Sequence, residues 1–73
     1  MDKTFYLEVY NYKYNSWLPI EIIDKLDDKV VKVRCYVYGK KLDDNGNTVK
    51  FLQTTIDTCV FWKHIRPIKN DLV

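Results

Sequence analysis

Two stretches of this chain alternate between apolar and polar side chains, strictly so in the first, and this alternation limits the chain to a fold built of strands. Residues 5–12 and residues 30–38 both follow a period of two. Because successive side chains of a β-strand point to opposite faces, each stretch predicts a strand with one buried face and one face in water. The residues expected on the buried faces are Phe5, Leu7 and Val9 in the first stretch, and Val31, Val33, Cys35 and Val37 in the second.

Three further strands are expected. Residues 18–23 place Leu18, Ile20 and Ile22 on one face. Pro19 has no backbone N–H to donate, so this strand is expected to begin irregularly or to lie at an edge. The remaining expected elements are strands at 49–57 and 59–62 and a single 3₁₀ turn within 62–66, before Pro67.

Composition and turn residues agree with an all-β domain. The chain contains no alanine, the strongest helix former, so long helices are not expected. Asn45 and Gly46 readily adopt the positive φ angles of a tight turn and predict a hairpin. Five short strands in 73 residues predict a small five-stranded SH3-like barrel with a short 3₁₀ turn near the C-terminus. We expect one domain over residues 1–73, with its core between residues 5 and 68.

Several function classes are disfavoured. The formal net charge is only +2, well short of a dedicated phosphate binder. Cys35 and Cys59 lack metal-type spacing, and His64 is the only histidine, so no metal or cofactor is expected. Ser16 is the only serine, and no catalytic constellation can be argued, so we expect no enzyme activity. There is no secretion signal and no apolar run of membrane-spanning length, so we expect an intracellular protein.

Two short motifs resemble a known family. Residues 17–22, W-L-P-I-E-I, resemble the W-x-P-A-x-I that begins the second strand of Tudor and Agenet domains, and residues 64–67, H-I-R-P, look like their closing I-R-P. Ile20 replaces the small alanine usual at its position. The resemblance implies an SH3-like barrel that reads methylated lysine or arginine on a protein tail, which would place it in the nucleus, on chromatin.

In such readers aromatic faces surround the cation of the ligand through cation–π attraction. The aromatic cage that the resemblance implies would draw on Tyr10, Tyr12 or Tyr14, with Trp17 beside them, and on Tyr36 and Tyr38.

This chain departs from the family after the third strand, where an acid often follows the aromatic residue and Gly39 follows Tyr38 here. The acids left to complete a cage are Glu8, Glu21, Asp43 and Asp44.

The tyrosines also suit roles that need no cage. Amphipathic tyrosine rings often simply cover the wet face of a small barrel. Alternatively, Lys32, Arg34, Tyr36 and Tyr38 share one strand face and fit a platform for single-stranded nucleic acid, with bases on the rings and phosphates near the cations. A third hypothesis is a small phage or host protein that binds a protein partner through its aromatic surface.

Overall fold

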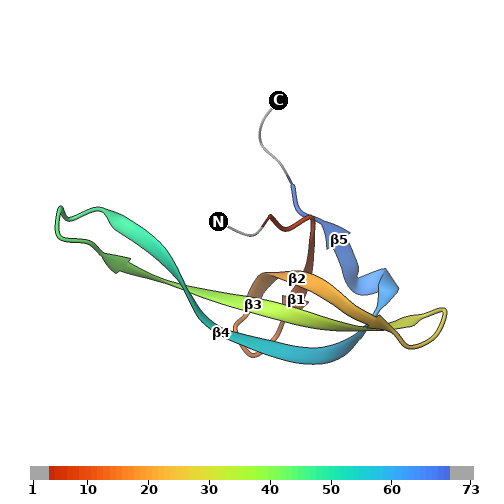
Figure 1. Cartoon of the computed structure of the whole chain (residues 1–73). Coiled ribbons are helices and arrows are strands. Elements are labelled where there is room, and N and C mark those ends of the chain that lie inside the picture. Colours follow the sequence, from red (N-terminus) through yellow and green to blue (C-terminus); the bar gives the residue numbers. More distant parts are fainter. Residues whose placement is uncertain (1–3, 70–73) are drawn as a thin grey trace.

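The computed structural model describes residues 4–69, and strands dominate this part of the chain (Figure 1). The all-β prediction is confirmed, as is the short 3₁₀ turn near the C-terminus. The elements are β1 (Leu7–Asn11), β2 (Ser16–Lys25), β3 (Val30–Leu42), β4 (Thr48–Phe61), the 3₁₀ turn η1 (Trp62–His64) and β5 (Ile65–Pro67).

The five strands form one antiparallel sheet in the order β4-β3-β2-β1-β5. Each of the first four strands pairs with its neighbour in sequence, and β5 returns to pair with β1. Among the described residues β4 and β5 lie at the two edges of the sheet, so closure into an SH3-like barrel stays a prediction. Figure 1 shows that the sheet is strongly curved, with β1 and β2 crossing the ribbon formed by β3 and β4.

Two predicted strands are one. Residues 49–57 and 59–62 were expected to be separate, but β4 runs without interruption through Thr58, which pairs with Val33 of β3. No turn residue breaks the chain there, and the β3 ladder continues past this point to Phe61. The fifth strand of the sheet is instead Ile65–Pro67, which was expected only to end a 3₁₀ turn.

The predicted core is largely confirmed, because the alternation buries one face of β1, β2 and β3. The buried hydrophobic cluster consists of Val9, Leu18, Ile20, Val31, Val33, Cys35 and Val37. Ile22 was expected with them but is 37% exposed, because the β1–β2 ladder begins at Leu7 and Ile20 and no β1 residue lies beside Ile22. We call the face of the sheet opposite this core the outer face.

Phe5 and Tyr36 also differ from expectation. Phe5 precedes β1, so the alternation of that strand does not hold it in the core, and its ring packs instead on Tyr36 of the outer face. Tyr36 was expected in water but is only 8% exposed. A tertiary contact between segments about thirty residues apart therefore overrides the strand pattern at both positions.

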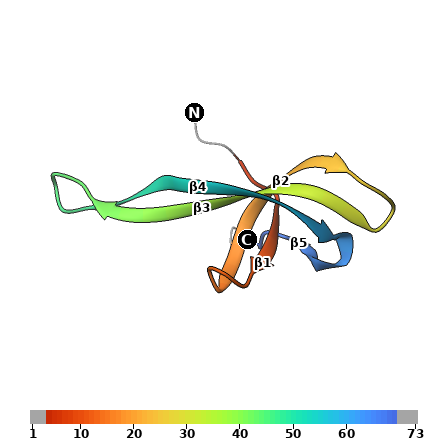
Figure 2. The same cartoon turned by 90° about the horizontal axis from the view of Figure 1, so that it is seen from below.

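A bulge divides β4. Val37 pairs with Thr54 and Tyr38 pairs with Leu52, so Gln53 is an extra residue on β4. Beyond the bulge β3 and β4 continue as a two-stranded arm, from Gly39 to Phe51, which Figure 2 shows reaching away from the other strands.

The tip of the arm is the predicted Asn-Gly hairpin. The Asp43 N–H donates to the Asn47 carbonyl at 2.8 Å, and Gly46 has a φ of 80°. The Asp43 carboxylate accepts hydrogen bonds from the backbone N–H groups of Asn45 and Asn47. These bonds keep the turn within five residues, which is why β3 extends past Gly39 to Leu42.

Candidate binding site

The six aromatic residues proposed for a single cage lie in different places. Tyr10, Tyr12 and Trp17 form one group, here called the Trp17 cluster, and Tyr36 and Tyr38 join Phe5 in a second, here called the Phe5 cluster. Tyr14 belongs to neither group and packs against the buried core from the β1–β2 loop.

The Trp17 cluster is built on the β1–β2 hairpin. Tyr10 and Trp17 are direct cross-strand partners, and their rings meet edge to face with centroids 5.7 Å apart. The Tyr12 ring also meets Tyr10 edge to face, with centroids 5.0 Å apart, and remains 87% exposed. The Tyr10 hydroxyl donates to the side-chain oxygen of Asn15, a residue held at a φ of 54° in the loop.

The face of Trp17 is occupied by a cation from the same chain. The guanidinium carbon of Arg66 lies 3.4 Å from the centre of the Trp17 ring. The Arg66 Nε donates to the Glu8 carboxylate at 2.6 Å, and the two residues face each other across β1 and β5. Of the acids considered for a cage, Glu8 is therefore the one beside the Trp17 cluster.

In the Phe5 cluster one tyrosine is structural and the other faces solvent. The Phe5 ring lies 4.7 Å from Tyr36 and 6.3 Å from Tyr38, centroid to centroid. The Tyr36 hydroxyl donates to Glu21 at 2.8 Å, which fixes the buried ring under Phe5. Tyr38 is half-buried and presents its ring to a groove on the outer face.

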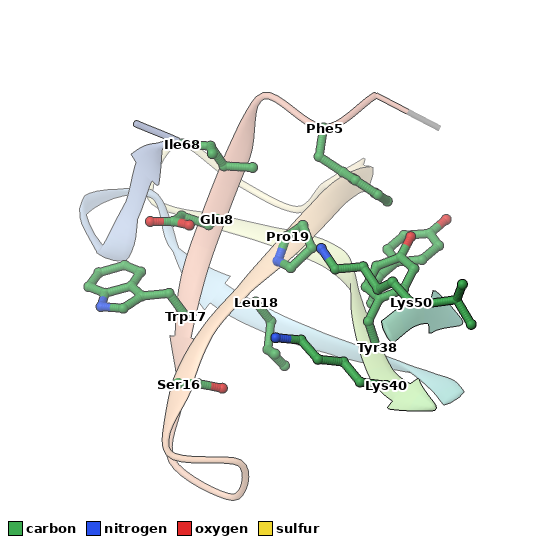
Figure 3. A pocket seen from close by; sticks show the side chains of 12 residues that line it. Phe5, Glu8, Ser16, Trp17, Leu18, Pro19, Tyr38, Lys40, Lys50 and Ile68 are labelled. Atoms are coloured by element: carbon green, nitrogen blue, oxygen red, sulfur yellow. The ribbon is translucent and has the colours of Figure 1, made fainter. Parts of the chain in front are cut away.

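Figure 3 shows this groove, which crosses the outer face between the segment before β1 and the base of the arm. Lys40 of β3 and Lys50 of β4 are direct cross-strand partners, and both side chains are directed toward the Pro19 side of the groove. The Lys50 ammonium lies 5.4 Å from the centre of the Tyr38 ring. The groove is lined by Phe5, Glu8, Ser16, Trp17, Leu18, Pro19, Tyr36, Tyr38, Lys40, Val49, Lys50 and Ile68.

The other two residues of the predicted nucleic-acid platform, Lys32 and Arg34, lie outside the groove. Arg34 is held in a two-point ion pair by Asp57 of β4, with distances of 2.8 and 3.1 Å. The Asp57 hydrogen bond and charge raise the pKa of Arg34 above its ordinary value, and the Arg34 hydrogen bond lowers the pKa of Asp57. Because Asp57 already offsets the Arg34 charge, the basic surface beside Tyr38 comes from Lys40 and Lys50.

Sequence reasoning missed Phe5, Lys40 and Lys50. The strands expected at 30–38 and 49–57 left Lys40 outside a strand, so its pairing with Lys50 was not predicted. Counting outward from a two-residue Asn45-Gly46 turn would have placed Lys41 opposite Lys50, one residue away from the observed register, in which Lys40 pairs with Lys50. No comparable signal in the sequence places Phe5 on the outer face.

Within residues 4–69 no group of three histidine, cysteine or acidic side chains could hold a metal ion. The same residues include no helix that could span a membrane. Comparison of the chain with protein-family models, with curated proteins and with solved structures gave no match. The candidate site is therefore defined by its geometry.

Proposed function

We propose that this chain is a non-catalytic binding module that takes single-stranded nucleic acid in the outer-face groove. The observation that supports this proposal is the Tyr38 ring, which lies beside the Phe5 ring and next to the paired lysines Lys40 and Lys50. Aromatic faces that stack bases and nearby cations that meet phosphates are the two elements of a single-strand binding surface.

The residues of the groove divide these tasks. Tyr38 and Phe5 offer ring surface to a base, and each stacked base contributes on the order of 1–3 kcal/mol. Tyr36, fixed by Glu21, supports the Phe5 ring from below. Lys50 lies over Tyr38 in the unbound protein, and its flexible side chain moves to a phosphate when a base takes that place. With two lysines at the groove, binding should be weak and salt-dependent.

Titration of an oligothymidylate of about ten nucleotides, followed by fluorescence anisotropy at low salt, tests the proposal. We expect Tyr38→Ala to weaken binding roughly tenfold, because it removes a stacking surface. Tyr6→Ala is the matched control, since Tyr6 is 76% exposed and lies outside the groove. Equal loss in both variants, or no binding at millimolar protein, would contradict the proposal.

The salt dependence gives a second readout. Each lysine that meets a phosphate should contribute about 0.7 to the slope of log K against log salt for a single strand. We expect Lys40→Ala and Lys50→Ala each to reduce the slope by about that amount. Lys25→Ala, at the far end of β2, should leave the slope unchanged.

The Trp17 cluster supports a second candidate, a reader of methylated lysine or arginine. Its favourable observation is that this cluster already holds a guanidinium between the Trp17 face and the Glu8 carboxylate. A methylated side chain would replace Arg66 there, which would associate the protein with methylated tails such as those of chromatin.

This candidate makes a distinct prediction. Arg66→Gln should strengthen binding of a trimethyl-lysine or dimethyl-arginine peptide, because it removes the competing internal cation. The measurement is the shift of the Tyr10 and Trp17 amide signals on addition of methylated and unmethylated peptide. No difference between the two peptides at millimolar concentration in either protein would exclude the reader function.

A further inference from the structure

β4 is a long edge strand with little of the protection that natural edge strands usually carry. It has 14 residues, contains no proline, and carries only two charged side chains, Lys50 and Asp57. Natural edge strands are commonly short, or protected by charges, prolines or a covering segment. Within residues 4–69 β3 is the only strand that pairs with β4, so the backbone groups of its far side are available to another strand.

The bulge at Gln53 changes which residues of β4 share a face. Tyr38 and Leu52 are partners on the outer face, as are Arg34 and Asp57. Leu52 and Asp57 thus share a face although they are five residues apart, an odd number. Lys50 and Asp57 therefore both lie on the outer face, whereas in a strand without a bulge they would lie on opposite faces. Phe51 and Ile56 both lie on the inner face for the same reason.

This arrangement makes the strand complementary to itself. We propose that a second copy of the chain pairs antiparallel with β4 around a two-fold axis between Gln53 and Thr54, which places each Lys50 opposite the Asp57 of the second copy. Directly opposed residues of an antiparallel pair share a face, and here every pair across the bulge meets that condition. The main opposed pairs are Thr48 with Cys59, Val49 with Thr58, Lys50 with Asp57, Phe51 with Ile56 and Leu52 with Thr55.

Charge and apolar surface favour this register. Asp57 is oriented by its ion pair with Arg34, so the arriving Lys50 ammonium meets a fixed carboxylate in each of two symmetric positions. Phe51, 38% exposed, covers Ile56 on the inner face, and Leu52, 50% exposed, gains a neighbour on the outer face. The other free edge, β5, has three residues and ends at Pro67, so it offers little to a second β4.

An engineered disulfide between the two copies would report the register of the proposed dimer directly. Cys59 is exposed and unpaired, and in the proposed dimer it lies opposite Thr48 of the second copy. The Cα atoms of such opposed residues lie about 4.5–5.5 Å apart, within the range of about 4.4–6.8 Å that a disulfide requires. We expect Thr48→Cys to form a covalent dimer under mild oxidation, seen on a non-reducing gel. Val49→Cys, whose thiol would be on the opposite face, is the matched control.

Sedimentation of the full chain supplies the solution test. We expect a concentration-dependent dimer that Lys50→Glu weakens roughly tenfold or more, because two attractive pairs become two repulsive ones. Lys13→Glu makes the same charge change in the β1–β2 loop and should not alter the dissociation constant. A monomer at millimolar concentration, a dimer insensitive to Lys50→Glu, or cross-linking no faster through Thr48→Cys than through Val49→Cys would overturn the proposal. These measurements use no nucleic acid, so they are independent of the proposed function.

Discussion

Replacing Arg66 by alanine should destabilise the fold by about 1–2 kcal/mol. The guanidinium stacks on Trp17 at 3.4 Å, and a partly exposed cation–π contact contributes on the order of 1 kcal/mol. The same side chain binds Glu8, which is 14% exposed while Arg66 is 43% exposed, and such a pair adds up to about 1 kcal/mol. In a domain of this size the midpoint of thermal unfolding should fall by roughly 5–15 °C.

The assay is urea and thermal unfolding followed by circular dichroism, with Lys69→Ala as the control for loss of an exposed charge near the same end of the chain. A double-mutant cycle with Glu8→Gln isolates the pair, and we expect a coupling energy of at least about 0.5 kcal/mol. Trp17 fluorescence in a Trp62→Phe background reports the loss of the stacked cation. If Arg66→Ala and Lys69→Ala unfold within about 0.3 kcal/mol of each other, the stacked pair does not stabilise the sheet and the reasoning is wrong.

Three further predictions concern stability. Val33→Ala should cost about 2 kcal/mol or more in urea unfolding, because two buried methyl groups are lost from a fully buried site; a smaller loss would show that the core relaxes into the space. Gly46→Ala should lower the midpoint of thermal unfolding by a few degrees, because alanine is strained at a φ of 80°, and an unchanged midpoint would mean that the turn is remodelled. Since Arg34 lowers the pKa of Asp57 in the folded state, this carboxylate stabilises the protein above about pH 4 and loses that effect as the pH falls through the lowered pKa. Asp57→Asn should therefore destabilise the protein more at pH 7 than at pH 2, and equal destabilisation at both pH values would contradict the ion pair.

The sequence predicted the parts of the fold that depend on local pattern. The alternation in residues 30–38 identified the buried side chains of β3, and the Asn-Gly pair located the hairpin. Continuity of β4 was not predicted, because Thr58 looks like a break in an apolar pattern until its pairing with Val33 is known. Whether a strand is interrupted depends on its neighbour in the sheet as well as on its own residues.

The candidate site was less predictable, because its contacts join distant segments. Trp17 and the tyrosines were identified as aromatic residues of interest, but their division into two clusters follows from the pairing of β1 with β2 and from the path of the chain before β1. The stacking of Arg66 on Trp17 requires the register between β1 and β5. No local pattern encodes that register, so the sequence identified residues of the site but not which of them lie together.

The return of β5 to β1 also bears on how the chain reaches its native state. The three hairpins of the meander connect strands that are adjacent in sequence, whereas Arg66 and Glu8 are 58 residues apart. Closing so long a loop carries a larger entropic cost than forming a hairpin, so we expect β5 to dock after the rate-limiting step of folding. Arg66→Ala would then speed unfolding while leaving the folding rate nearly unchanged, giving a φ-value near zero. Until β5 docks, the outer edge of β1 is exposed, and partly folded chains are most open to misassociation along it.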